Sequence, residues 1–257
     1  WVMNSSLGGD CAAPAGLSLS PSCTPASRPG LRLYRRSAAA THTREVDMLR
    51  SGSLLMTRAL GGFTMSSSVK VLAFAGSLRK DSYNKKLVKL AAAGARAAGA
   101  EVTYVDLADL PMPIFNEDLE KSEGMPPNGR KFKELLITHQ AMLISSPEYN
   151  SSISGALKNA IDWASRPEPN EPPLVAFAGK VAGLMAASPG ALGGLRGLVT
   201  VRSILGNIQV LVVPDQVAIN TAHEQFNPDG SLKDAKKQQA VEAIGKKVVM
   251  VAGKLHG

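Results

Sequence analysis

Short apolar runs and stretches with helical apolar spacing alternate regularly from residue 69 to the end of the chain. Runs typical of buried strands cover residues 69–75, 102–106, 141–145, 180–187 and 208–213. Apolar positions that recur every three or four residues predict helices over residues 83–98, 130–138, 154–165, 192–205 and 232–255. Residues 107–127 and 214–229 are rich in proline and polar residues, and they predict loops.

This alternation predicts a fold of the α/β class with a parallel sheet at its centre. The strands are almost continuously apolar, which indicates that helices cover both faces of the sheet. Five strands of this length favour a flavodoxin-like, doubly wound sheet with strand order 2-1-3-4-5, in one domain over residues 69–257. In such a sheet, ligands bind in the crevice at the carboxyl ends of strands one, three and four.

The turn between the first strand and its helix carries an unusual set of polar side chains. Gly76 ends the strand, and the turn that follows contains Ser77, Arg79, Ser82 and Asn84. A helix N-terminus favours an anion through its unpaired N–H groups and its dipole, and these side chains add donors for a phosphate. The glycine spacing matches neither the dinucleotide fingerprint nor the P-loop, which leaves the kind of cradle that flavodoxin-like folds use for FMN. The alternative is an ordinary turn with Ser82 as the helix N-cap.

The loop after the third strand is the second candidate. It contains, in order, Pro147, Glu148, Tyr149 and Asn150, and it leads into a helix with a clean apolar stripe. Tyr149 offers a face for stacking on a planar ligand, and Asn150 offers hydrogen bonds to ring carbonyls and nitrogens. The alternative is a loop that only caps the helix through Ser152 or Ser154.

A glycine-rich loop that includes Ser188 and Gly190 follows the fourth strand. Glycines let backbone amides approach a ligand closely, and the alternative is a flexible loop before a tightly packed helix. All three loops share one edge of the predicted sheet, so a single crevice would collect them. This convergence is the main argument for a ligand site.

Composition excludes several kinds of chemistry from residues 69–257. Both cysteines, Cys11 and Cys23, precede this region, and the four histidines are scattered without the spacing of metal ligands. His139 at a predicted helix end is typical of a helix stabiliser. The net charge is +4 (22 − 18) with no basic run interleaved with aromatics, which favours a small anionic ligand over nucleic acid. We therefore expect no metal site, no catalytic side chain, and a bound cofactor for any redox chemistry.

Residues 1–68 differ sharply in composition from the rest. They contain seven Arg, no Lys, three acidic residues and twelve Ser, without sustained apolar periodicity. This is typical of a disordered transit peptide and would direct the protein to a chloroplast or mitochondrion. A translated leader is the alternative because the chain begins at Trp1 and offers later starts at Met48, Met56 and Met65, the last of which would give a cytoplasmic protein. No apolar stretch is long enough for a membrane span.

The three loops together resemble the NADPH-dependent FMN reductase family, which includes chromate and quinone reductases and plant NAD(P)H:quinone oxidoreductases. The resemblance covers the chain from about residue 69 onward and lies in AGSLRKDSYN (75–84), SSPEYNSSISGALKNAIDWASRP (145–167) and SPGALGGLR (188–196). It implies FMN that is bound tightly but without a covalent link. By motif position, the phosphate would contact Ser77, Arg79, Ser82 and Asn84. The ring would lie against Pro147, Glu148, Tyr149 and Asn150, and Ser188 and Gly190 would complete the cradle.

The resemblance also implies an activity and an assembly. Hydride would pass from NADPH or NADH to flavin N5 and then to a quinone, or to a chromate, ferric or azo compound. Tyr149, Asn150 and Arg166 match positions near the nicotinamide or substrate. Arg196 and Arg202 match helix arginines that lie toward subunit interfaces of homodimers or homotetramers. The segment around Val199 departs from the plant pattern, which leaves the acceptor and the interface open. The alternatives are a flavodoxin-type electron carrier, an enzyme that releases reduced FMN, and an FMN-binding module without nicotinamide turnover.

Overall fold

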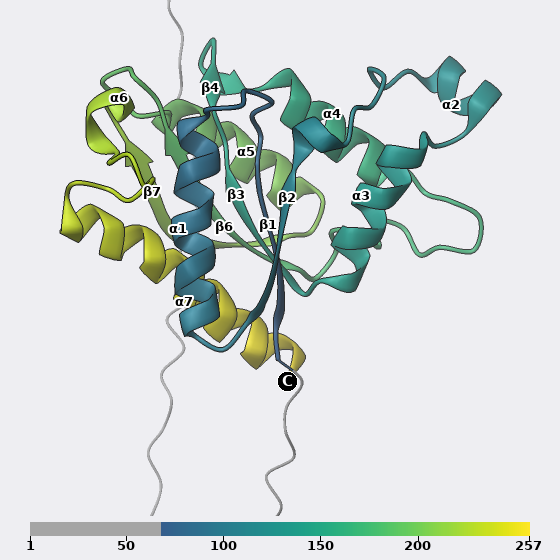
Figure 1. Ribbon diagram of the computed structural model, residues 1–257. Coiled ribbons are helices and arrows are strands. Elements are labelled where there is room, and N and C mark those ends of the chain that lie inside the picture. Colours follow the sequence, from purple (N-terminus) through teal and green to yellow (C-terminus); the bar gives the residue numbers. More distant parts are fainter. Residues whose placement is uncertain (1–67) are drawn as a thin grey trace, which may run out of the picture. The chain divides into compact units, whose positions relative to one another are not determined.

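The computed structural model describes residues 68–257, and its centre is a five-stranded parallel sheet (Figure 1). The strands are β1 (Lys70–Ala75), β2 (Glu101–Asp106), β3 (Ala141–Ser145), β6 (Val181–Ala187) and β7 (Leu211–Ile219). They lie in the order β2-β1-β3-β6-β7. Counted along the sheet's own strands, this is the order 2-1-3-4-5, so the predicted fold is confirmed.

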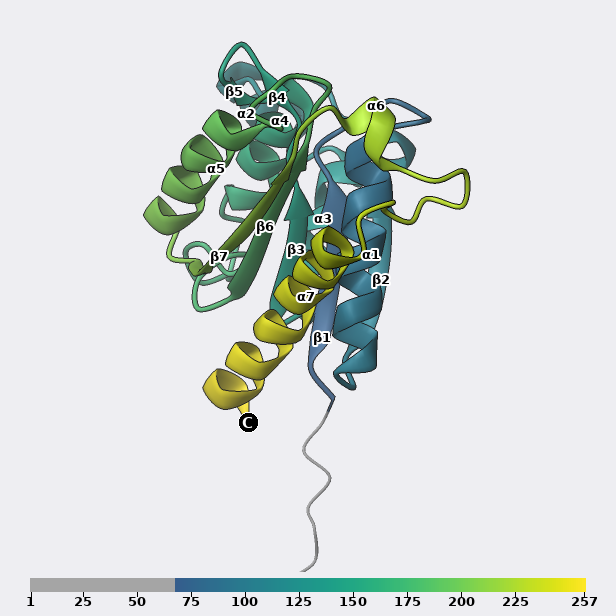
Figure 2. The same ribbon diagram turned by 90° about the vertical axis from the view of Figure 1, so that its left-hand side faces the viewer.

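Helices cover both faces of the sheet (Figure 2). The helices α1 (Tyr83–Ala97) and α7 (Ala235–His256) lie on one face, and α3 (Pro127–Thr138), α4 (Gly155–Ser165) and α5 (Leu195–Asn207) lie on the other. The remaining elements are the 3₁₀ turn η1 (Leu107–Asp109), the short helices α2 (Glu117–Glu123) and α6 (Ala222–Gln225), and the hairpin of β4 (Glu148–Tyr149) and β5 (Ser152–Ile153).

Successive residues of each central strand enter two separate apolar cores. In β1, Leu72 and Phe74 pack with the core under α3, α4 and α5, whereas Val71, Ala73 and Ala75 pack under α1 and α7. Side chains of a strand alternate between its faces, so a strand that is covered on both faces must be apolar at every position. The continuous apolar runs in the sequence have this cause.

Two glycines let α1 and α7 pack closely. A Cβ atom on Gly245 would lie 2.0 Å from the carbonyl oxygen of Ala91, and one on Gly94 would lie 2.1 Å from that of Glu242. Neither contact is sterically allowed, so this helix crossing requires glycine at both positions.

The fifth strand of the sheet differs most from its prediction, because β7 runs from Leu211 to Ile219 and not over residues 208–213. Pro214 has no backbone N–H and therefore predicts the end of a strand. In the structure it lies in a bulge, where the partners of β6 shift between Ala182 and Leu184. The guanidinium of Arg202 donates to Val213 O at 2.9 Å and so satisfies a carbonyl at the bulge. The predicted loop over 214–229 is correspondingly wrong, since it holds the end of β7 and all of α6.

Smaller differences from the prediction concern the loop over residues 107–127 and the first residues of two helices. The predicted loop over 107–127 contains η1 and α2, and α2 buries no residue, so it leaves no apolar pattern in the sequence. Its sequence signal is Asn116, whose side chain accepts from the Asp118 N–H at 2.8 Å. The helix α3 starts three residues earlier than predicted, with Pro127 in its first turn. The helix α7 begins at Ala235 rather than at 232, because the Asp234 carboxylate caps it.

The extension predicted for residues 1–68 lies outside the described residues, except for Ser68, and so does the predicted transit peptide. Within residues 68–257, no helix combines the length and the apolar content that crossing a membrane requires.

Candidate functional site

The turn after β1 is fixed to two neighbouring elements. The Gly76 N–H donates to Ser145 O at 2.9 Å, and the hydroxyl of Ser154 donates to Gly76 O. A Cβ on Gly76 would lie 2.9 Å from Leu157 Cβ, which explains why glycine ends the strand. The turn therefore has a defined position against the carboxyl end of β3 and the start of α4.

The predicted phosphate-binding side chains of this turn fall into a buried and an exposed class. Ser77 and Ser82 are each 3% exposed, whereas Arg79 is exposed. The Ser82 hydroxyl accepts from the Asn84 N–H at 3.2 Å and is the N-cap of α1. Capping and phosphate binding are compatible, since a hydroxyl that accepts from the backbone still has a proton to donate.

Asn84 connects α1 to the two central strands that follow it in the sheet. Its Nδ2 donates to Ala187 O at 2.9 Å, and its Oδ1 accepts from the Ala187 N–H at 2.9 Å and from the Ser145 hydroxyl at 2.8 Å. The residue is 4% exposed. The amide that the resemblance assigns to the phosphate thus holds the scaffold beneath the turn.

The loop after β3 forms a hairpin. Glu148 pairs with Ile153 and Tyr149 with Ser152, and the two residues between them, Asn150 and Ser151, have φ angles of 51° and 64°. Two positive φ angles in a two-residue turn are the signature of type I′. Tyr149 is 52% exposed on this hairpin, which leaves its ring accessible to a ligand. The alternative cap is also present, because Ser154 accepts from the Leu157 N–H at 3.1 Å and caps α4.

The carboxylate of Glu148 is directed at α5. It accepts from Arg196 Nε at 2.8 Å and from the Gly197 N–H at 3.1 Å. Burial raises the pKa of the Glu148 carboxyl, but the hydrogen bonds from Gly197 and Arg196 outweigh burial and leave this pKa below its usual value. The carboxylate is therefore ionised at neutral pH.

The loop after β6 is held by backbone hydrogen bonds to the end of β7 and to the start of α6. The Ser188 N–H donates to Ile219 O at 3.0 Å, its carbonyl accepts from the Ala222 N–H at 3.1 Å, and its hydroxyl accepts from the Gly190 N–H at 3.2 Å. Ser188 thus ties the loop to the end of β7 and to α6.

A cavity of about 100 Å³ lies where the three loops meet. Eight of the ten residues predicted to bind the cofactor line it, namely Ser77, Arg79, Ser82, Asn84, Pro147, Glu148, Tyr149 and Ser188. The other two, Asn150 and Gly190, do not. Sequence reasoning missed Tyr83, Ala187 and Pro189, which also line the cavity. Tyr83 is the first residue of α1, and its ring stacks on Phe226 with 5.7 Å between the centroids. Its place between Ser82 and Asn84 is the sequence signal that could have found it.

The donor set of this cavity fits the phosphate end of FMN. It contains two buried hydroxyls and a guanidinium, and of the described residues that line it only Glu148 carries a carboxylate, which is paired with Arg196. Its volume is below the ~300–1,000 Å³ typical of sites that enclose a whole ligand of this size. The cavity could therefore hold the phosphate end of the cofactor but not the whole molecule.

A larger cavity of about 350 Å³ lies on the other side of the β1 turn. It is lined mainly by apolar side chains, among them Leu78, Leu110, Met112 and Ile114. Its one amide side chain, Asn159, is occupied with the Phe115 N–H at 2.8 Å and with Pro113 O at 2.9 Å. This cavity has no groups for a phosphate, so the smaller polar cavity is the cofactor candidate.

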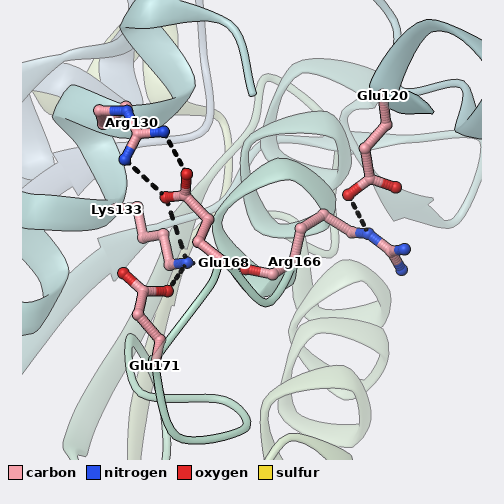
Figure 3. Close-up of polar contacts among 6 residues, drawn as sticks. All are labelled: Glu120, Arg130, Lys133, Arg166, Glu168 and Glu171. Carbon is pink, nitrogen blue, oxygen red and sulfur yellow. Dashed lines mark hydrogen bonds and ion pairs between the residues drawn. The ribbon is translucent and has the colours of Figure 1, made fainter. Parts of the chain in front are cut away.

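Arg166 does not lie with these loops. It follows the last residue of α4, roughly 16 Å along the helix from the hairpin. Its Nε donates to Glu120 at 2.7 Å, and this hydrogen bond raises the pKa of the guanidinium. Figure 3 shows the Arg166 guanidinium at Glu120 and away from Lys133, which is buried, contacts Glu168 and Glu171, and donates to the backbone carbonyl of Arg166 at 2.7 Å. Arg166 therefore holds α2 and does not line the smaller cavity, and its place near the nicotinamide or substrate stays a prediction.

The described residues contain no group of three or more His, Cys, Asp or Glu that could hold a metal ion. His139 is buried at the end of α3, with Nδ1 2.6 Å from Leu135 O and Nε2 2.8 Å from the Thr103 hydroxyl. Burial lowers its pKa. His139 is thus a stabiliser of the helix end, as predicted, but it acts as a neutral hydrogen-bonding group.

Comparison with known proteins identifies the family. A model of the family described as NADPH-dependent FMN reductase matches residues 69–224. An NAD(P)H-dependent FMN reductase of Pseudomonas aeruginosa is 37% identical over 179 residues, which cover 69% of this chain and 92% of the relative. An NAD(P)H:quinone oxidoreductase of Solanum tuberosum is 37% identical over 194 residues, or 74% and 95% of the two chains. Among solved structures, the flavoenzyme NAD(P)H:(acceptor) oxidoreductase of Paracoccus denitrificans has a TM-score of 0.62 at 29% identity, over 72% of this chain and 98% of its own. The chain belongs to the NADPH-dependent FMN reductase family.

Proposed function

We propose that this protein is an FMN-dependent NAD(P)H oxidoreductase that transfers hydride from NADPH or NADH to a quinone or a similar small acceptor. The observation that carries this proposal is the convergence of the β1, β3 and β6 loops on one polar cavity. Relatives support the proposal as well, because an FMN reductase and a quinone oxidoreductase align with this chain over 92% and 95% of their own length.

In this proposal, the chain binds and orients, and it supplies no acid or base. Bound FMN supplies the redox chemistry, since it accepts a hydride and passes electrons to an acceptor. Ser77, Arg79 and Ser82 hold the phosphate, Tyr149 and the hairpin backbone support the ring, and Asn84 keeps the turn in place from below. Tyr149, which would support the ring, is 52% exposed, so the site is open to solvent and to small planar acceptors such as quinones.

An electron carrier without a nicotinamide site is the weaker reading. The relatives named above are reductases or oxidoreductases. In addition, residues 69–257 carry a net positive charge of +4 (22 − 18), whereas a carrier of this type recognises partners through an acidic face.

We also propose that copies of the chain assemble through α5, as a homodimer or homotetramer. Leu192, Leu195 and Val199 gather at the start of this helix and are 50%, 43% and 65% exposed. Apolar side chains grouped in this way are typical of contact surfaces.

The composition of residues 1–68 supports an organelle as the compartment of the protein. Imaging of a fluorescent protein fused to those residues would test this proposal.

The first experiment is anaerobic stopped-flow mixing of NADPH with the FMN-loaded full chain, followed by addition of benzoquinone. We expect the oxidised flavin band to bleach with NADPH and to recover with benzoquinone. Bound flavin that neither NADPH nor NADH bleaches would overturn the proposed enzyme activity in favour of the electron carrier.

Arg79→Met should weaken FMN binding by about tenfold or more, because a charge-assisted phosphate contact is lost. Lys131→Met, at an exposed position on α3, is the matched control and should bind FMN as the unaltered chain does.

A further inference from the structure

Helix α5 begins without a capping side chain of its own. The residue before it is Gly194, with a φ of 94° and no side-chain hydrogen bond to the helix. The first N–H groups of any helix lack intrahelical partners, and a side-chain acceptor normally takes one of them. In α5 the N–H of the third residue, Gly197, donates to Glu148, which lies 49 positions earlier in the chain. Glu148 thus does the work of an N-cap from a different loop.

Glycines at positions 194 and 197 allow the start of α5 to approach the hairpin closely. A Cβ on Gly197 would lie 3.3 Å from Ser152 O and 3.4 Å from Glu148 Cβ. One on Gly194 would lie 2.7 Å from Ala186 Cβ and 3.8 Å from Glu148 Cβ. The helix start therefore packs directly against both strands of the hairpin, and larger residues at these glycines would push the two apart.

The hairpin is anchored on both strands, by Ile153 of β5 in the apolar core and by Glu148 of β4 at α5. Each of its strands has two residues, it is separate from the main sheet, and an isolated two-stranded hairpin is marginally stable at best in water. Glu148 is the residue of β4 that holds it, with a side chain that is only 9% exposed. The next residue, Tyr149, lines the cavity of the candidate site.

We propose that Glu148 is a positioning residue, whose carboxylate caps α5 and thereby fixes the β4–β5 hairpin at the place where Tyr149 and the turn meet the flavin ring. This inference rests on the proposed function. The hydrogen bond from the Gly197 N–H contributes more to the position of the hairpin than the ion pair with Arg196 does. The Arg196 side chain is 59% exposed, and exposed ion pairs contribute little to stability. The carboxylate acts on the ring through the position of the hairpin.

The test compares FMN with riboflavin, which has the same ring but no phosphate. Binding to the full chain is measured by quenching of flavin fluorescence, and the visible circular dichroism of the bound flavin is recorded at saturation. Glu148→Ala should weaken the binding of both flavins by a similar factor, about tenfold for the loss of a cap, and should change the dichroism. Arg79→Met should weaken FMN alone. Arg196→Met, which leaves the Gly197 contact intact, should stay within about threefold of the unaltered chain.

Glu148→Gln keeps the inference testable if the alanine variant does not fold. Its amide oxygen can still accept from Gly197 while its NH₂ group meets Arg196, so its effect should lie between those of Glu148→Ala and Arg196→Met. Glu224→Gln, at an exposed carboxylate that contacts His223, is the matched control and should change nothing.

Three outcomes would overturn the inference: unchanged flavin binding and dichroism in Glu148→Ala, an equal loss in Arg196→Met, or a loss restricted to FMN. None of these readouts depends on nicotinamide. A chain that binds FMN through an intact hairpin but is not reduced by NADPH or NADH would refute the proposed function and leave Glu148 as a positioning residue.

Discussion

The hydrogen bonds of Asn84 predict that Asn84→Ala lowers the stability of the protein even without a ligand. Its amide makes three buried hydrogen bonds, two with the backbone of Ala187 and one with the hydroxyl of Ser145. They connect α1 to β3 and β6, the strands whose ends form the crevice. Alanine removes all three and leaves the backbone groups of Ala187 buried without these partners.

The expected loss is about 3 kcal/mol, since a typical net contribution is about 1 kcal/mol for each of three hydrogen bonds. For a domain of this size, about 1 kcal/mol corresponds to roughly 2–4 °C in Tm, so the melting temperature should fall by about 6–12 °C. Urea unfolding of the FMN-free chain, followed by far-UV circular dichroism, measures this loss directly.

Asn128→Ala is the matched control, because Asn128 makes one exposed hydrogen bond, to Pro111 O at 2.8 Å. It should cost less than about 0.5 kcal/mol. In a double-mutant cycle, Ser145→Ala should couple to Asn84→Ala by about 1 kcal/mol, because the two side chains share a hydrogen bond. An Asn84→Ala chain within about 0.5 kcal/mol of the unaltered one, with weakened FMN binding, would refute the scaffold role and assign the amide to the phosphate.

Three further predictions concern the scaffold away from the crevice. Lys133 is buried among carboxylates, so Lys133→Met should lower the free energy of unfolding in urea by about 3 kcal/mol, and an unchanged value would contradict the network in Figure 3. Burial lowers the pKa of His139 below 6.5, so the unfolded chain binds a proton that the folded one does not. Stability should therefore fall as the pH drops from about 7 to 5, and His139→Gln should flatten that fall in urea titrations at both pH values. Gly245→Ala places a methyl group 2.0 Å from Ala91 O and should cost about 1–3 kcal/mol or more in thermal unfolding, whereas Gly206→Ala, where a Cβ meets nothing within 4 Å, should be neutral or stabilising.

The central strands could be predicted from sequence because burial on both faces forces a local pattern. The strand β1 lies within one residue of its predicted bounds, and β3 matches its prediction. The strand β7 could not be predicted in full, because Pro214 predicts a strand end from the local sequence, whereas in the structure it lies in a bulge whose carbonyl at Val213 accepts from Arg202 of α5. The helix α2 was missed for the opposite reason, since it packs no side chain into the core and its signals are the Asn116 cap, the acidic residues of its first turn and Gly124 at its end.

The candidate site could be predicted to the level of its loops and most of its lining residues. The direction of each side chain could not, because it depends on contacts with distant segments. The carboxylate of Glu148 is turned by α5, and Arg166 is held by Glu120 of α2. Motif position alone placed Glu148 against the flavin ring and Arg166 near the nicotinamide or substrate, and the structural partners of both residues were not visible in the sequence.

The polar residues of the motifs therefore have two kinds of work, and the structure separates them. The side chains of Asn84 and Glu148 form hydrogen bonds that hold α1, α5 and the hairpin in place. Arg79 and Tyr149, in contrast, remain exposed at the mouth of the cavity. A ligand that binds only the folded state stabilises it by RT ln(1 + [L]/Kd), so a lost ligand contact lowers the stability of the FMN-loaded protein alone. A lost scaffold contact lowers the stability of the FMN-free protein as well. The difference between the two unfolding free energies, measured with and without FMN, thus assigns each motif residue to one class without any assay of turnover.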